Sequence, residues 1–101
     1  MKSTHVELVY FRETGKYYSE GELDLPYKPN GQDDVRPWMF HEVLEHVADL
    51  LNRGERPGLV DGMHFDVLVV VYTEFGPLRF MFVRDKDGYV GMRSLRVTEA
   101  Y

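Results

Sequence analysis

Residues 37–54, PWMFHEVLEHVADLLNRG, form the one segment whose apolar residues recur with the spacing of an α-helix. At about 100° per residue, the apolar side chains fall on one arc and the charged ones on the opposite arc. The predicted buried arc is Met39, Phe40, Val43, Leu44, Val47, Leu50 and Leu51. Pro37 suits a first helical turn, and Gly54 can adopt the left-handed conformation that ends a helix. Because a helix with one apolar arc must cover something flat, the rest of the chain is expected to supply a sheet.

The remaining apolar runs have the alternation and composition of β-strands. We predict strands over residues 5–12, 17–25, 65–72, 78–84 and 89–97. Polar turns at 13–16 and 85–88 predict hairpins, and the run at 65–72 predicts a central strand because it is apolar on both faces. The expected outward side of the second strand is Tyr18, Glu20, Glu22 and Asp24. Gly21, in the middle of that strand, is a candidate β-bulge.

This order of elements, ββαβββ, predicts the fold class. Every link between strands is short except the one that contains the helix, so the sheet should be largely antiparallel. We expect an α+β two-layer sandwich, in which one helix packs on one face of a five-stranded sheet. The 101 residues fit a single domain over residues 1–101. The longest irregular stretch, 25–36, is expected to be either a crossover to the helix or a functional loop.

The motifs of common catalytic and metal sites are missing from the sequence. Without cysteine there is no thiolate nucleophile, disulfide or cysteine metal site. His41 and His46 are five residues apart, so on a helix they point about 140° away from each other and cannot share a zinc ion. No serine lies in a Gly-x-Ser-x-Gly turn, and no phosphate-binding glycine motif is present. We therefore predict no catalytic residue, no metal and no cofactor, and favour a protein that is not an enzyme.

Charge and hydropathy restrict the partners. The net charge of −5 disfavours a nucleic-acid binder, because such proteins need clusters of lysine and arginine. Residues 62–101 hold five acids and five bases, so the whole acidic excess lies in residues 1–61. No signal peptide and no apolar run of about 20 residues is evident, which predicts a cytoplasmic protein outside the membrane.

A candidate binding face combines aromatic and acidic side chains on the predicted helix and the loop before it. Its members are Tyr27, Trp38, Glu42, Glu45 and Asp49. Such a face suits a basic protein partner, since aromatic residues are common at binding hot spots. The alternative is that Trp38 folds back over the start of the helix and packs on Tyr27 or the prolines. The leading hypothesis is a protein-interaction module that binds a host protein or, as a homodimer, a second copy of itself.

The runner-up hypothesis is a small-ligand binding protein. In this reading, the loops at 26–36 and 55–62 form a cleft for a nucleotide or metabolite. Arg56 and Asp61 would supply its polar groups, while Gly58 and Gly62 allow unusual backbone angles.

Two further stretches carry a resemblance. Residues 17–22 (YYSEGE), after a Gly-Lys hairpin, and residues 53–62 (RGERPGLVDG), after the helix, resemble small uncharacterised proteins of bacteriophages and their bacterial hosts. The similarity covers about the first two-thirds of the chain and consists of turn and packing motifs. It implies an intracellular protein, encoded by a phage or its host, that acts in or against a host cell. It assigns no functional residue.

Overall fold

The computed structural model describes residues 2–12, 15–58, 65–83 and 95–97. Along the chain the elements are β1 (Ser3–Phe11), β2 (Tyr17–Pro26), β3 (Lys28–Pro29), β4 (Val35–Arg36), α1 (Phe40–Asn52), β5 (Asp66–Thr73), β6 (Gly76–Phe82) and β7 (Leu95–Val97).

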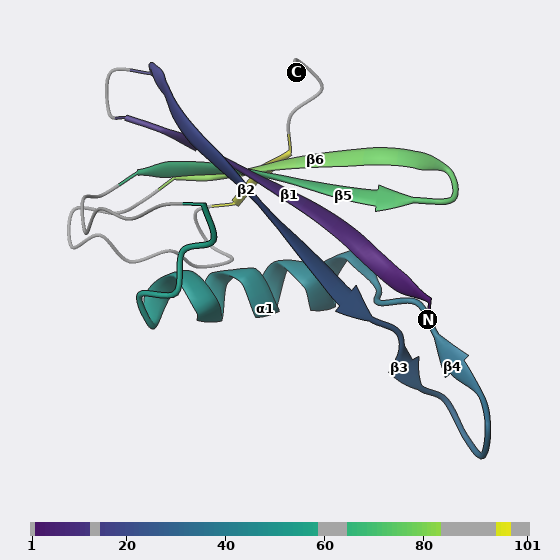
Figure 1. The fold of residues 1–101 in the computed structure, drawn as a ribbon. Coiled ribbons are helices and arrows are strands. Elements are labelled where there is room, and N and C mark those ends of the chain that lie inside the picture. Colours follow the sequence, from purple (N-terminus) through teal and green to yellow (C-terminus); the bar gives the residue numbers. More distant parts are fainter. Residues whose placement is uncertain (1, 13–14, 59–64, 84–94, 98–101) are drawn as a thin grey trace.

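The main sheet has the strand order β2-β1-β5-β6-β7, and every neighbouring pair is antiparallel. Four of these strands are seven to ten residues long, whereas β7 has three. Helix α1 lies on one face of the sheet (Figure 1). The prediction of an α+β fold with one helix on an antiparallel sheet is therefore confirmed. Of the predicted strand 89–97 only β7 is described, and the predicted hairpin at 85–88 lies outside the described residues.

The core lies between α1 and the sheet face that it covers. In β1 the burial alternates, with Val6 and Leu8 fully buried toward the helix, opposite Val71 and Val69 of β5. All residues from Val67 to Val71 are buried, as predicted for a central strand. Residues from the predicted helical arc complete the core, namely Val43, Leu44, Val47 and Leu51, joined by Ala48.

The start of the helix differs from the prediction. Residues 37–39 are not helical; Met39 is the N-cap in an extended conformation, and Phe40 is the first helical residue. The side chain of Glu42 accepts a hydrogen bond from the Met39 N–H and so caps the N-terminus of the helix at this point, as in a capping box. Met39 and Phe40 are about half exposed rather than buried, although the Phe40 ring stacks on Phe80 at 5.9 Å. At the other end Gly54 has φ 86°, as expected for a left-handed helix terminator.

The stretch 25–36 is more ordered than the sequence predicts. It contains a second, two-stranded sheet in which Lys28 pairs with Arg36 and Pro29 with Val35. The Asn30 N–H donates to the Asp34 carbonyl at 2.9 Å and closes the turn. This β3–β4 arm projects from the body beside the start of α1 (Figure 1). The prediction of an irregular loop is therefore wrong for this segment.

The irregularity in β2 occurs near Tyr18 rather than at Gly21. Tyr10 pairs with Ser19 and Phe11 with Tyr17, so the register skips Tyr18. Tyr18 therefore packs against the core, with its ring 4.8 Å from that of Phe65, and does not join the outward carboxylates. The bulge prediction for Gly21 is wrong, because Gly21 is in regular register with Leu8.

Gly21 instead makes room for a close backbone contact. A Cβ atom at Gly21 would lie 2.1 Å from the carbonyl oxygen of Pro57, and one at Gly58 would lie 2.1 Å from the carbonyl oxygen of Glu20. The Tyr10 hydroxyl donates to the same Pro57 carbonyl at 2.8 Å. The segment after α1 is thus fixed against the inner side of β2.

Candidate functional site

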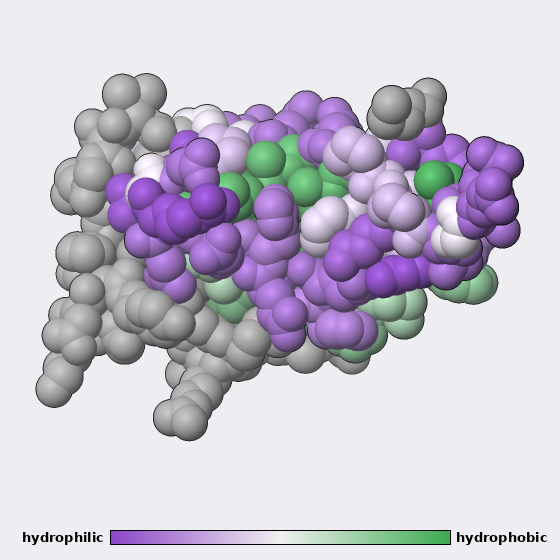
Figure 2. Space-filling model, turned by 90° about the horizontal axis from the view of Figure 1, so that it is seen from below, coloured by the Kyte–Doolittle hydropathy of each residue, from purple (hydrophilic) through white to green (hydrophobic). Residues whose placement is uncertain are grey.

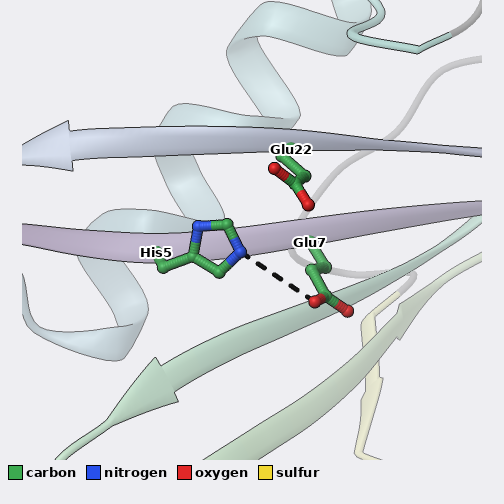
Figure 3. A group of neighbouring side chains, drawn as sticks. All are labelled: His5, Glu7 and Glu22. Carbon is green, nitrogen blue, oxygen red and sulfur yellow. Dashed lines mark ion pairs between the residues drawn. The ribbon is translucent and has the colours of Figure 1, made fainter.

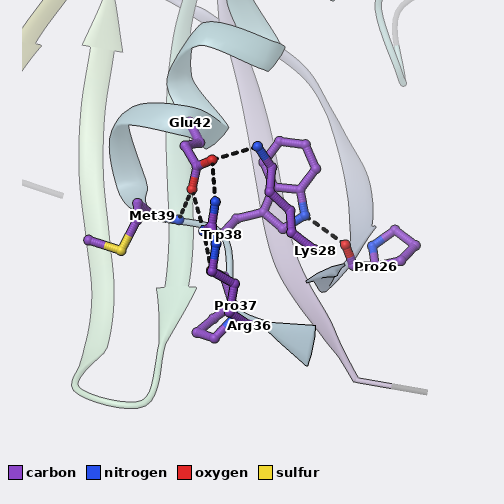
Figure 4. Close-up of polar contacts among 7 residues, drawn as sticks. All are labelled: Pro26, Lys28, Arg36, Pro37, Trp38, Met39 and Glu42. Atoms are coloured by element: carbon purple, nitrogen blue, oxygen red, sulfur yellow. Dashed lines mark hydrogen bonds and ion pairs between the residues drawn. The ribbon is translucent and has the colours of Figure 1, made fainter. Parts of the chain in front are cut away.

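Two regions collect the acidic and aromatic side chains that the sequence draws attention to. The first joins the β3–β4 arm to the start of α1, and we call it the helix-start cluster: Pro26, Lys28, Arg36, Trp38 and Glu42 (Figure 4). Its central group is the Glu42 carboxylate, whose side chain is only 15% exposed. Arg36 donates to both carboxylate oxygens, at 2.7 and 2.9 Å, and Lys28 donates as well. These bonds from Arg36 and Lys28, with that from the Met39 N–H, hold the pKa of Glu42 far below its ordinary value.

Trp38 is also engaged within this cluster. Its indole N–H donates to the Pro26 carbonyl at 2.7 Å, and Lys28 Nζ lies 4.5 Å from the ring centroid in a cation–π contact. The ring of His46 lies 5.3 Å away on the helix. Trp38 is half-buried and packs against the core. This is the arrangement in which Trp38 folds back over the helix start, so much of its surface is not available to a partner.

The other members of the predicted helix face are dispersed. Tyr27 is half-buried, and its N–H donates to the Lys2 carbonyl at 3.1 Å, which continues the pairing of β1 and β2. Glu45 is exposed, and Asp49 is exposed but pairs with Arg53 at 3.2 Å. Seen from the α1 side, the surface is largely hydrophilic with a hydrophobic area near its centre (Figure 2). The described acidic groups of this face are thus partly neutralised and partly isolated.

The described parts of the two loops of the predicted ligand cleft, residues 26–36 and 55–58, lie at opposite ends of α1. Residues 26–36 pack at the start of α1, whereas residues 55–58 follow its end (Figure 1). A helix of 13 residues separates the two ends by about 20 Å. Arg56 is half-buried, and its Nε atom has no hydrogen-bond partner within the described part of the chain. Asp61 lies outside the described residues. A single cleft between 26–36 and 55–58 is therefore not formed.

The second region, which we call the acidic strip, lies on the sheet face turned away from α1. It consists of four carboxylates on two neighbouring strands, Glu7 on β1 and Glu20, Glu22 and Asp24 on β2. Strand alternation places them there, since Val6 and Leu8 on either side of Glu7 point into the core. The register then sets Glu7 directly opposite Glu22. The outward direction of the three β2 carboxylates is as predicted.

His5 lies at one end of the acidic strip. Its Nδ1 atom is 2.8 Å from Asp24 and its Nε2 atom 3.9 Å from Glu7, while its ring packs 5.4 Å from that of Tyr72. The hydrogen bond to Asp24 and the charges of Asp24, Glu22 and Glu7 raise the pKa of His5, although desolvation opposes them. A hydrogen bond to Glu7 likewise raises the pKa of Tyr72. The sequence analysis missed His5 and Glu7 because only the pairing register brings them to the β2 carboxylates.

Three of these side chains have the geometry of a possible metal-binding group. Figure 3 shows His5, Glu7 and Glu22 turned toward one another, and their ligand atoms lie within 4.8 Å of one another. An imidazole and two carboxylates are ligands that divalent cations accept. All three side chains are at least partly exposed, and exposed groups gather in this way without a metal as well. The group by itself therefore assigns no metal.

Within the described part of the chain, the carboxylates of the strip have few cationic partners. Among the residues that the structure describes, the ion pairs of these four carboxylates are those with His5, and none involves lysine or arginine. Like charges directly opposite each other, as in the pair Glu7 and Glu22, are unfavourable on a sheet. The strip is therefore a surface on which an incoming cationic group would relieve repulsion.

Comparisons with protein-family models, curated proteins and solved structures give no match to this chain. Within the described residues, no helix has the length and apolar composition needed to cross a bilayer. The functional argument consequently depends on the geometry of the two regions above.

Proposed function

We propose that this protein is a non-enzymatic protein-interaction module that binds a basic partner through the acidic strip. The observation that carries the proposal is the group of four carboxylates, Glu7, Glu20, Glu22 and Asp24, with only one imidazole to balance them in the described structure. They are held on two long paired strands, so little ordering of the backbone would accompany binding.

We choose the acidic strip over the helix face by comparing how many cationic partners the carboxylates of each already have. Glu42 already has two cationic partners and Asp49 has one, whereas Glu20 and Glu22 have none among the described residues. A charge that lacks an internal partner attracts an external one more strongly and steers its approach. The resemblance to phage and bacterial proteins supports a host protein as the partner, with this chain as its inhibitor or modulator.

The experiment compares two variants of equal charge. Tagged wild-type protein, Glu20→Lys/Glu22→Lys and Glu45→Lys/Asp49→Lys would each be incubated with host lysate, and native mass spectrometry would identify what is retained. We expect a partner that is captured by the wild type and the helix variant, lost from the strand variant, and released by added salt.

Other outcomes are equally informative. Loss only from the helix variant would move the interface to the helix face, as the sequence first predicts. Equal loss from both variants would show that net charge alone matters, and no capture by the wild type would contradict the proposal. Each variant would first be checked for native folding by thermal unfolding.

A further inference from the structure

Strand β2 forms one border of the main sheet. It is the terminal member of the order β2-β1-β5-β6-β7 and is ten residues long. In the described part of the chain, no backbone hydrogen bond is made to its outer edge at residues 20–24, and Gly58 packs against this edge at the Glu20 carbonyl, which leaves residues 22–24 open. A long unpaired edge is the feature to which an extended segment of another protein can add by backbone hydrogen bonds.

The pairing with β1 shows which residues present their backbone at this edge. The Tyr27 N–H donates to the Lys2 carbonyl, so these two residues form a hydrogen-bonded pair at the end of the ladder. In an antiparallel ladder hydrogen-bonded and non-hydrogen-bonded pairs alternate. Counting back from Tyr27 in steps of two, Leu25, Leu23 and Gly21 bond to β1.

The residues between them therefore direct their N–H and C=O groups away from β1. These residues are Asp24, Glu22 and Glu20, the three members of the acidic strip that lie on β2. Pro26, two residues after Asp24, also faces away from β1 in this alternation. Proline suits the position because an N–H there would have pointed to the open edge and not to β1. At Glu20 the edge is covered, because Gly58 packs against the Glu20 carbonyl. At Glu22 and Asp24, the open hydrogen-bonding positions and the carboxylates without a lysine or arginine partner in the described structure belong to the same residues.

This coincidence specifies the complementary segment. An added antiparallel strand forms hydrogen-bonded pairs with Glu22 and Asp24, and residues directly opposite in such a pair project their side chains to the same face. The residues facing these carboxylates occupy every second position of the added strand. Lysine or arginine at these positions would neutralise the strip, and the intervening residues would point to the other side of the sheet.

We propose that the open edge of β2 and the acidic strip together form a docking surface for an extended segment of a partner protein with a basic residue at every second position. The segment adds to the main sheet as a further strand beside β2. This inference rests on the proposed function and deepens it by stating the conformation and charge pattern of the bound segment.

A second copy of this chain fits the same edge poorly. A two-fold axis through Glu22 would set Glu20 of one copy opposite Asp24 of the other, so that carboxylates would face each other along the new pair. Edge charges of this kind oppose self-association. The charge pattern therefore favours a basic segment over self-pairing through β2.

The test uses short capped peptides in which lysine and threonine alternate. In one variant the backbone nitrogens of the central lysines are methylated, and in its matched control those of the same number of threonines are methylated. Both peptides keep the same charge, but only lysine amides point toward β2 in the proposed pairing. Affinity would be measured by fluorescence anisotropy with a chelator present, and hydrogen exchange of the protein amides by NMR.

We expect the parent and the threonine-methylated peptide to bind with similar Kd, and the lysine-methylated peptide to bind at least about tenfold more weakly. The parent should slow the exchange of the Glu22 and Asp24 amides. The charge variant Glu20→Lys/Glu22→Lys should lose binding of every peptide, whereas Glu45→Lys/Asp49→Lys should retain it.

Equal affinity of the two methylated peptides, with unchanged exchange at β2, would overturn strand addition and leave the acidic strip as a surface that binds by charge alone. If none of the three basic peptides binds, the docking proposal is overturned. The acidic residues would then serve only to keep the edge from aggregating. In that case the lysate experiment decides separately whether the proposed function survives with a partner of another shape.

Discussion

The helix-start cluster and the acidic strip contain similar side chains but differ in how their charges are paired. In the helix-start cluster, Glu42 is enclosed by Arg36, Lys28 and the Met39 N–H. In the acidic strip, Glu7 and Asp24 pair with His5, and Glu20 and Glu22 have no ion-pair partner among the described residues. The first arrangement ties the β3–β4 arm to the start of α1, and the second is the one through which we propose that a partner binds. An acidic residue beside an aromatic one therefore says little about binding until its counter-ions are known.

The largest expected effect concerns the backbone contact that supports the strip from its inner side. Gly21→Ala should destabilise the protein by about 3 kcal/mol, because the new Cβ would meet the backbone of Pro57 and no flexible side chain could yield. Gly15→Ala is the control, since Gly15 has φ 77° but open space around it, and should cost about 1 kcal/mol. Urea unfolding measures both. Equal losses would show that the segment at Pro57 does not depend on Gly21.

The second prediction tests whether Trp38 is structural. Trp38→Ala should cost about 2 kcal/mol, because it removes a half-buried ring and the contact with Lys28. Trp38→Phe keeps much of the apolar contact but loses the hydrogen bond to Pro26, and should cost about 1 kcal/mol. Thermal unfolding gives the comparison. If both variants are as stable as the wild type, Trp38 is not structural and its side chain is available for binding.

The third prediction concerns the pH dependence of the helix-start cluster. The hydrogen bonds that Glu42 accepts from Arg36, Lys28 and the Met39 N–H lower its pKa. The carboxylate therefore contributes stability that is fully present above its ordinary pKa of 4.5. That stability is lost as the pH falls through the lowered value. Glu42→Gln should therefore reduce the Tm at pH 7, by less than Trp38→Ala, and the difference should shrink in strong acid. A constant difference across the acid range would contradict this assignment.

The smallest effect on stability is expected in the strip. Glu22→Gln should change the free energy of unfolding by no more than about 0.5 kcal/mol, and in the stabilising direction, since it relieves repulsion with Glu7. The same change should weaken binding of the alternating lysine–threonine peptide. A large destabilisation would mean that the strip is structural, as the helix-start cluster is, and would remove the contrast between the two regions.

Local patterns in the sequence were sufficient for the main elements. The apolar spacing of residues 37–54 identifies α1, and the fully apolar run at 65–72 identifies β5 as the central strand. The register bulge at Tyr18, the β3–β4 arm and the exposure of Met39 and Phe40 were not predictable in this way. The bulge at Tyr18 accompanies packing of its ring on Phe65, which is distant in the chain. The β3–β4 arm pairs within residues 28–36, but strands of two residues are too short to show an alternating pattern.

The candidate site shows the same division. The outward direction of Glu20, Glu22 and Asp24 follows from alternation along one strand, which fixes the face of every second residue. Tertiary structure decides which carboxylates find cations: the β3–β4 arm carries Lys28 and Arg36 to Glu42, while the β1–β2 register sets Glu7 against Glu22. Backbone periodicity is a local property that the sequence determines by itself. Neutralisation of a charge requires two groups within a few ångströms, and only the folded chain brings them there.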